Sequence, residues 1–202
     1  MNTIDNLVSY YGVFDGINNW KRPLNYWVTV CNIGKEPIVM REPIHIYKAS
    51  DSDDGTFSGG NMCYGGGGSI GPFFYKPYPE IAVKWYTVEP EDYKKGLKNP
   101  DWSDFDMNKV LKRKSVGCTV PVKLPEEFTK SKGNEIIFFI DSDYNKVYVS
   151  YVIEVNEDKY KEIDSDGNLF NIEKAIGRKL PKTAEGHYPY TPYNEWHLWG
   201  NR

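Results

Sequence analysis

The sequence predicts a mainly β protein with sandwich-like antiparallel sheets and one or two short helices. Segments of aromatic and β-branched residues recur along the 202-residue chain, whereas the 3.6-residue periodicity of an amphipathic helix is scarce. Aromatic residues make up 15% of the chain, and the 16 tyrosines among them suit the pleated surface of a sheet. The chain length is that of one large domain, and we expect residues 1–202 to form a single unit.

The first half of the chain predicts three strand regions and one irregular stretch. Residues 26–32 form an aromatic and β-branched run, and the apolar run 38–49 is interrupted by Pro43. The polar, glycine-rich stretch 50–71 is expected to be neither a helix nor a central strand, because glycine weakens both. Residues 80–88 alternate between two sets of side chains, which predicts a strand with one buried face.

The second half contains the clearest local signal, a β-hairpin. A short helix is expected at 90–98 and an extended segment at 115–122. The apolar runs 135–140 and 146–155 flank the polar turn residues 141–145, which is the pattern of strand, turn and strand. In the second arm alternate residues should lie on opposite faces, one buried and one partly exposed to water.

The end of the chain combines a short helix with an aromatic tail. Residues 171–179 predict the helix, and from about residue 181 the chain is rich in Tyr, Pro and Trp. Proline at this density argues against regular structure, yet the aromatic content argues against a free tail. We expect the tail to pack on the domain.

Composition and charge exclude several classes of function. The net charge is -3 and no basic run is interleaved with aromatics, so nucleic acid is not an expected partner. No stretch approaches the roughly 20 apolar residues of a membrane span. The first residues lack the features of a signal peptide. The protein is therefore expected either in the cytoplasm or behind a signal segment that is not part of this sequence.

Cysteine and histidine spacing predicts no metal site. Cys31, Cys63 and Cys118 allow one disulfide at most, and which pair would form it is left open. None belongs to a CxxC motif, and the three histidines are too far apart for a zinc-enzyme motif. Each cysteine is expected to be a small buried residue, although Cys63 could also be a reactive thiol.

Three aspartate-rich segments resemble fragments of calcium loops. They lie at 51–55, 141–145 and 164–168, but none matches the ligand spacing of an EF-hand. Asx turns explain them more simply, because Asp and Asn side chains bond their own backbone. No serine-nucleophile elbow or phosphate loop is present either. We expect no catalytic residue, metal or cofactor, and hence no enzyme.

The glycine-rich segment 58–71 allows two explanations. Its glycines can permit a close backbone approach beneath a packed neighbour. Alternatively, the segment is an exposed loop that a partner contacts.

The middle of the chain resembles a known family. Residues 37–40 and 44–47 precede Gly59-Gly60 and the segment Cys63-Tyr-Gly-Gly-Gly-Gly68, and a proline-containing link leads to Ala82-Val-Lys-Trp85. Over about residues 35–90 this resembles bacterial envelope proteins and lipoproteins that are regarded as immunity proteins against type VI secretion lipase effectors. The family carries a Cys-Cys pair after the glycines, whereas here a single cysteine precedes them.

The resemblance implies a periplasmic protein, possessing a lipid anchor in its precursor, that neutralises a cognate phospholipase or lipase toxin by binding it. The candidate contact residues belong to the acidic and glycine-rich stretch and to the aromatic cluster that follows; they are Asp51, Asp53, Asp54, Asn61, Tyr64, Phe73, Phe74 and Tyr75. For Phe73 and Phe74 burial in the core is the alternative. Two other functions remain open: an envelope carbohydrate- or ligand-binding module without catalysis, and a hydrolase that assembles its site from distant residues and would lose activity in Cys63→Ala.

Overall fold

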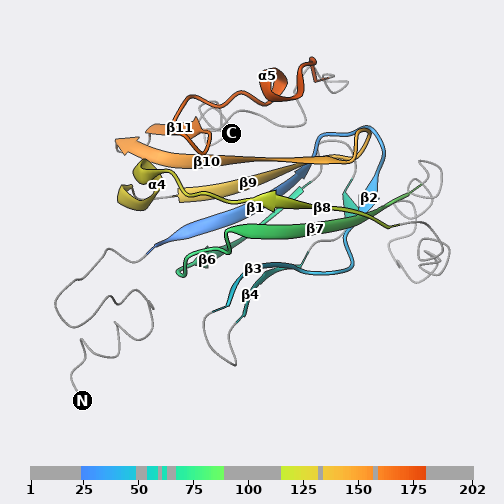
Figure 1. The fold of residues 1–202 in the computed structure, drawn as a ribbon, viewed down its shortest axis with the longest axis horizontal. Helices are drawn as coiled ribbons and strands as arrows, with labels where there is room; N and C mark the ends of the chain where they lie inside the picture. Colours follow the sequence, from blue (N-terminus) through green and yellow to red (C-terminus); the bar gives the residue numbers. More distant parts are fainter. Residues whose placement is uncertain are drawn as a thin grey trace, which may run out of the picture.

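The computed structural model describes residues 24–48, 54–58, 61–62, 67–88, 115–131, 134–156 and 159–180, and these form layered β-sheets (Figure 1). The predicted mainly β class is confirmed. The strands are β1 Tyr26–Asn32, β2 Ile38–Val39, β3 Ile44–Lys48, β4 Asp54–Phe57, β5 Asn61–Met62, β6 Gly67–Phe73, β7 Glu80–Thr87, β8 Ser115–Pro121, β9 Asn134–Asp141, β10 Lys146–Asn156 and β11 Lys159–Ile163. The helices are α4 Glu126–Lys130 and α5 Ile172–Ile176.

The largest sheet has five strands in the order β11-β10-β9-β1-β6. Three of its four neighbouring pairs are antiparallel, whereas β1 and β9 run parallel, with Tyr26 opposite Asn134 and Asn32 opposite Ile140. A second sheet has the order β5-β2-β7-β8, and β3 and β4 form a two-stranded ribbon. The parallel pair joins segments more than 100 residues apart, so local sequence patterns did not predict it.

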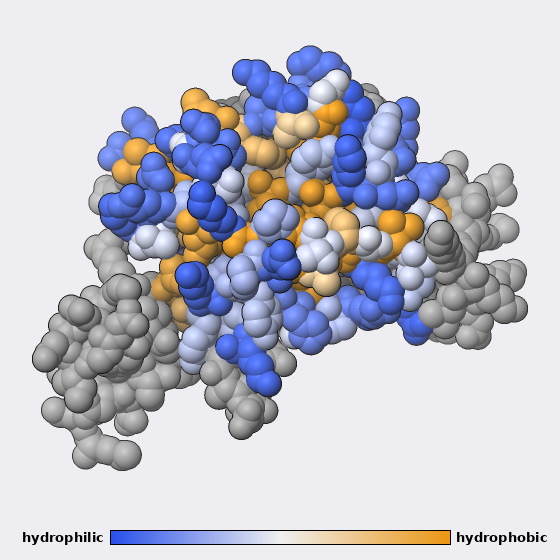
Figure 2. Space-filling view, viewed as in Figure 1, coloured by the Kyte–Doolittle hydropathy of each residue, from blue (hydrophilic) through white to orange (hydrophobic). Residues whose placement is uncertain are grey.

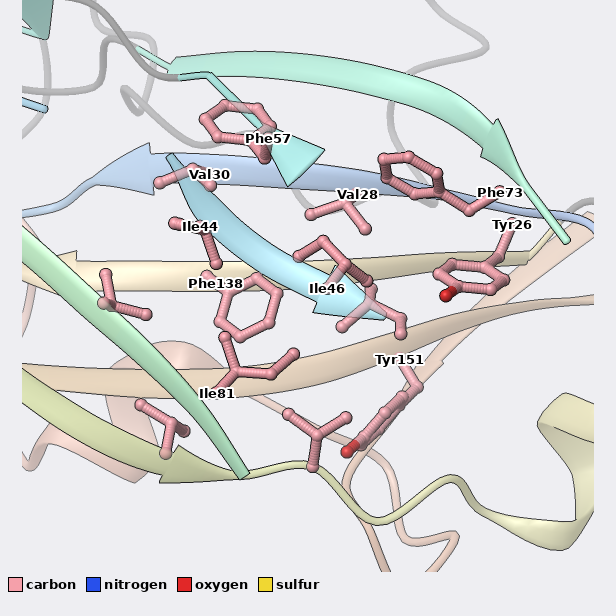
Figure 3. Packing of buried hydrophobic residues seen from close by; sticks show 14 of the residues in the cluster. Tyr26, Val28, Val30, Ile44, Ile46, Phe57, Phe73, Ile81, Phe138 and Tyr151 are labelled. Carbon is pink, nitrogen blue, oxygen red and sulfur yellow. The ribbon is translucent and has the colours of Figure 1, made fainter. Parts of the chain in front are cut away.

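The main core lies between the five-stranded sheet and the other two sheets (Figure 3). Each layer contributes side chains that are almost fully buried, among them Val28 from β1, Ile46 from β3, Trp85 from β7 and Phe138 from β9. Helix α4 adds Phe128, whose ring meets Tyr26 and Tyr151 edge-on, at 6.0 and 5.6 Å between centroids. The predicted alternation in β7 is confirmed, because Ile81, Val83 and Trp85 all point into this core.

The outer face of the five-stranded sheet carries a second apolar cluster. Cys31, Ile137, Phe139 and Val152 lie there under the segment that contains α5. Every residue of β9 is therefore buried. The expectation that one face of the second hairpin strand, β10, is partly exposed to water is wrong in the middle of that strand, where both faces are buried. Hydropathy follows this layering: in Figure 2 hydrophobic residues cross the middle of the molecule and hydrophilic residues surround them.

The local predictions for the hairpin and the last helix are confirmed. Strands β9 and β10 pair antiparallel from Asp141 opposite Lys146, and Asn145 closes the turn with a φ of 54°, which Asn tolerates. Helix α5 begins after Asn171, whose side chain accepts a hydrogen bond from the Lys174 amide (2.9 Å), and ends at Gly177 with a φ of 71°. The expected helix at 90–98 and the tail from 181 lie outside the described residues.

Part of the glycine-rich segment forms the edge strand β6 rather than a loop. A Cβ on Gly67 would collide with the Val30 carbonyl oxygen and lie 3.2 Å from the Cys31 Cα. At Gly71 a Cβ would lie 3.0 Å from the Trp27 ring. These two positions support the first of the two explanations, a close approach of the backbone to its neighbour strand. Residues 63–66 of the segment lie outside the described residues.

Two adjacent glycines of β6 test this explanation. Gly67→Ala should lower the free energy of unfolding by about 1–3 kcal/mol, because the new methyl group meets backbone atoms that cannot turn away. Gly68→Ala is the matched control, since its Cβ would lie 3.6 Å from the Phe57 ring, an ordinary contact. Urea denaturation of both variants provides the measurement. Equal losses at the two positions would contradict the explanation.

Candidate functional site

Several of the predicted contact residues cannot be placed in this structure. Asp51, Asp53 and Tyr64 lie outside the described residues. Asp54 begins strand β4 and Asn61 begins strand β5, but only their backbone is described. The acidic stretch therefore stays a prediction.

Phe73 is a core residue and does not belong to a contact surface. Its ring is buried and packs against Tyr26 at 5.8 Å and against Tyr47 at 5.6 Å between centroids. The expectation that Phe73 contacts a partner is wrong because its position opposite Tyr26 points it inward. Phe74 and Tyr75 are half-buried, and the Tyr75 carbonyl accepts a hydrogen bond from the Tyr26 hydroxyl (2.7 Å).

A different set of polar residues gathers where the β1–β2 turn meets the β9–β10 turn. Gly34 makes this approach possible, because a Cβ there would lie 2.6 Å from the Ser142 backbone nitrogen and 2.8 Å from that of Asp143. The Glu36 carbonyl accepts hydrogen bonds from the Asn32 side-chain amide and the Ser142 hydroxyl, both 2.9 Å. The two turns are therefore joined through side chains as well as by close packing.

Asp143 completes the junction. Its Oδ1 accepts the backbone N–H of Lys35 (2.8 Å) and that of Glu36 (3.2 Å). Within the first turn, the Gly34 amide donates to Asn32 Oδ1 (3.0 Å). One carboxylate thus holds two successive amides of a turn more than 100 residues away, which restricts the motion of both turns.

Beside this junction a largely buried ion pair contacts an exposed tyrosine. Arg178 Nη1 and Nη2 donate to the Asp141 carboxylate at 2.6 and 3.0 Å, a two-bond geometry typical of strong pairs. Asp141 is 1% exposed and the Arg178 side chain 26%. The Arg178 guanidinium lies over the Tyr144 ring, 4.7 Å from its centroid, which is cation–π geometry. Tyr144 itself is 61% exposed.

The ion pair also explains the protonation of Arg178. Burial of the guanidinium alone would lower its pKa, but the hydrogen bond and the negative charge of Asp141 raise it above the usual value. Arg178 is therefore a permanent cation, held in one place by Asp141.

These residues border a surface cleft of about 410 Å³. Its lining residues come from both turns and from the segment after α5; they are Ile33, Lys35, Asp143, Tyr144, Arg178 and Lys179. The lining offers hydrogen-bond donors from Lys35, Arg178 and Lys179 beside the apolar surface of Ile33 and the Tyr144 ring. This arrangement suits recognition.

No protein-family model matches this chain, nor does any curated protein or solved structure. The resemblance over about residues 35–90 therefore stays a prediction. Among the described residues, no cluster of three or more His, Cys, Asp or Glu side chains could hold a metal. No helix in the described ranges is long and apolar enough to cross a membrane.

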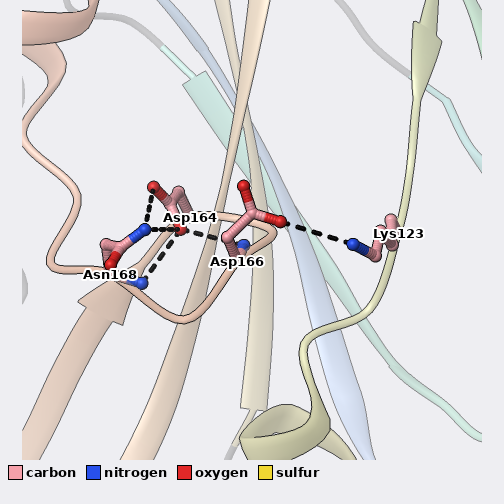
Figure 4. Close-up of polar contacts among 4 residues, drawn as sticks. All are labelled: Lys123, Asp164, Asp166 and Asn168. Carbon is pink, nitrogen blue, oxygen red and sulfur yellow. Dashed lines mark hydrogen bonds and ion pairs between the residues drawn. The ribbon is translucent and has the colours of Figure 1, made fainter.

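The turn at 164–168 is an Asx turn, as the sequence predicted (Figure 4). Asp164 Oδ1 accepts the backbone amides of Asp166 (2.9 Å) and Asn168 (3.0 Å). Its burial would raise the pKa of Asp164, but these hydrogen bonds lower it below the usual value. Asp166 binds Lys123 at 3.3 Å. In the 141–145 segment, by contrast, the aspartate side chains bind Arg178 and the other turn.

Two buried carboxylates on the outer face of the five-stranded sheet were not predicted. Glu135 accepts a hydrogen bond from the Thr29 hydroxyl, and Glu162 accepts one from the Ser150 hydroxyl (2.6 Å). Each bond links neighbouring strands, so we assign these carboxylates to sheet stability.

The cysteines show no bond between Cys31 and Cys118, which lie on β1 and β8 in different sheets. Burial raises the pKa of the Cys118 thiol. Cys63 lies outside the described residues.

Breaking the ion pair should destabilise the fold. Asp141→Ala leaves the Arg178 cation without its carboxylate partner. In urea denaturation we expect the free energy of unfolding to fall by about 3 kcal/mol, which is the lower end for buried ion pairs because Arg178 is partly exposed. Lys123→Ala is the control, since it breaks an exposed pair and should cost less than about 1 kcal/mol. Similar small losses for both variants would show that the pair does not stabilise the turn end.

Glu173 should make the fold sensitive to acid. The pKa of Glu173 lies below its usual 4.5 because its carboxylate accepts hydrogen bonds from the Lys179 side chain and from the Leu180 backbone amide (2.9 Å). The positive charge of Lys179 lowers this pKa further. A lowered native pKa means that the stabilisation is present above pH 4.5 and disappears as the pH falls through the native value. Urea denaturation at a series of pH values from 4.5 downward measures this loss. The free energy of unfolding should fall less steeply with decreasing pH in Glu173→Gln than in the unmodified protein, and Lys179→Met should show part of the same effect. An unchanged decline in Glu173→Gln would refute this assignment.

Proposed function

We propose that this protein is an immunity protein that binds and neutralises a secreted antibacterial effector, a phospholipase or lipase delivered by a type VI secretion system. Its place would be the periplasm, with a lipid anchor in the precursor. Two lines of argument support the proposal: the resemblance over about residues 35–90, and the geometry of the cleft at the turn end.

The observation that carries the proposal is the clamped, exposed Tyr144. Residues that dominate binding energy at protein interfaces are most often Trp, Tyr and Arg. Tyr144 projects into solvent while Arg178 and Asp141 fix its surroundings from below. The contact with the Arg178 guanidinium restricts the ring, which reduces the side-chain entropy that binding would cost. Such a rigid aromatic anchor is what an inhibitory interface requires.

The scaffold behind the anchor is suited to the same role. The anchor belongs to the β9–β10 hairpin, whose first strand is buried along its whole length. The hairpin turn is joined to the β1–β2 turn through Asp143 and Ser142. An inhibitor that acts by covering its target needs a fixed surface and no chemistry of its own, and the cleft lining fits this description.

The residues that carry the resemblance have structural positions. Val83 and Trp85 are buried core residues of β7, and Gly67 is a close-approach position in β6. In this chain the shared pattern therefore specifies how the sandwich is built. A contact surface that is particular to each effector and immunity pair would lie elsewhere, as the Tyr144 cleft does.

One observation favours the second candidate function, an envelope carbohydrate-binding module. Trp27 is 45% exposed on the outer face of β1, and its ring lies next to Gly71, which has no side chain to cover it. Exposed aromatic rings of this kind can stack on sugar rings. Quenching of tryptophan fluorescence by envelope oligosaccharides, lost in Trp27→Ala, would favour this function.

Co-purification with the product of the neighbouring gene tests the immunity proposal. We expect a stoichiometric complex with a lipid hydrolase, whose activity falls on binding. Tyr144→Ala should weaken the complex by about 30-fold or more, because loss of a central aromatic anchor costs roughly 2 kcal/mol.

Tyr78→Ala is the matched control. Tyr78 is also exposed, at 37%, but is not part of the cleft lining. Absence of a complex with well-expressed neighbour product would refute the immunity proposal. Equal weakening by both tyrosine variants would refute the role of the cleft.

A further inference from the structure

The cleft beside Tyr144 contains hydrogen-bond donors that the described part of the chain does not fully satisfy. A guanidinium group has five N–H donors. The Arg178 hydrogen bonds both go to the Asp141 carboxylate, one from Nη1 and one from Nη2. Since Arg178 is 26% exposed and lines the cleft, its remaining N–H groups are available to a ligand there. Asp141 holds them in a fixed direction.

Lys35 brings a second cation to the same cleft. Its backbone amide is bound by Asp143 (2.8 Å), so the position from which its side chain extends is fixed. Lys35 is exposed and lines the cleft. Lys179 also lines the cleft, but its ammonium group binds Glu173 at 2.6 Å. Arg178 and Lys35 are therefore the two cations best placed to meet a ligand.

The negative groups near the cleft are already engaged. Asp141 is buried beneath Arg178, Asp143 Oδ1 accepts two backbone amides, and Glu173 binds Lys179. With the three cations Lys35, Arg178 and Lys179, these three carboxylates make the set neutral overall. Attraction at this site would therefore come from directed donors and not from a net positive charge. Such a site suits a singly charged anion with two neighbouring oxygen atoms that can each accept a hydrogen bond.

We infer that this cleft binds a carboxylate of the partner, an Asp or Glu side chain on a loop that also carries an apolar residue. The carboxylate would accept hydrogen bonds from Arg178 and Lys35, and the apolar neighbour would lie against Ile33 and the Tyr144 ring. The volume of about 410 Å³ is in the range of ligand sites. The inference rests on the proposed function, since it states what the cleft recognises in the effector.

A phosphate group is less suitable for this cleft. A dianion would bring a second negative charge close to Asp143 and Glu173, which a single carboxylate avoids. Since a guanidinium can bind either group with two bonds, the charge of the ligand decides between them. The proposed ligand is therefore a peptide carboxylate.

An NMR titration of the ¹⁵N-labelled full chain tests the inference without the effector. The probes are two acetylated and amidated peptides, Ala-Leu-Glu-Ala and Ala-Leu-Gln-Ala, and inorganic phosphate. The Glu peptide should shift the amide signals of Lys35 and Tyr144 and the Arg178 Nε–H signal, and bind at least 10-fold more tightly than the Gln peptide. Arg178→Lys keeps the charge but loses the two-bond geometry, and should weaken Glu-peptide binding at least 5-fold.

Equal responses to the Glu and Gln peptides, or shifts located away from the cleft, would overturn the inference. Tighter binding of phosphate than of the Glu peptide would overturn the choice of ligand. The variant Lys35→Ala changes an exposed side chain and guards against misfolding of the Arg178 variant. It should weaken Glu-peptide binding at least 3-fold, and an unchanged affinity would contradict the inference.

The effector complex separates this inference from the proposed function. A complex that forms with unchanged affinity in Arg178→Lys and Lys35→Ala would refute the carboxylate site and leave the immunity function standing. Selective binding of the Glu peptide without any effector complex would support the site and refute the immunity function.

Discussion

The parallel pairing of β1 with β9 is the constraint on which the rest of the structure depends. It joins segments more than 100 residues apart, residue by residue from Tyr26 opposite Asn134 to Asn32 opposite Ile140. Parallel strands end at the same edge of a sheet, so the turns that follow them emerge side by side. The pairing therefore brings the β1–β2 turn and the β9–β10 turn together, and it places β1 where β6 can pair with its other edge.

The candidate site is a consequence of this geometry. Once the turns are adjacent, Gly34 allows contact, Asp143 binds the amides of the opposite turn, and the segment after α5 brings Arg178 to Asp141. The outer apolar cluster holds that last segment on the sheet, because it includes Ile172 and Leu180. Folding energy and the candidate site are thus connected, because the side chains that join the turn end also contact Tyr144 and hold the donors of the cleft.

Local sequence patterns predicted local structure well and distant contacts poorly. The hairpin, the alternation of β7 and the short helix α5 follow from periodicity, turn residues and capping, all contained in short windows. The β1–β9 register and the pair of Asp141 with Arg178 join residues that are distant in sequence, and no short window contains both partners. The site was missed for this reason, although the Asp-rich turn itself was recognised. Aromatic content alone also did not decide between partner contact and core burial for Phe73, whereas its pairing opposite Tyr26 places it in the core.

Hydrogen exchange at the Lys35 and Glu36 amides tests most directly whether the turn end is a rigid, preorganised surface. Both residues are exposed, so unstructured turn amides here would exchange quickly. Because Asp143 accepts both N–H groups, we predict slow exchange in the unmodified protein and fast exchange in Asp143→Ala. The Val122 amide, bonded to the Pro79 carbonyl (2.8 Å), should be unaffected by the substitution. Fast exchange of Lys35 and Glu36 in the unmodified protein would contradict the account.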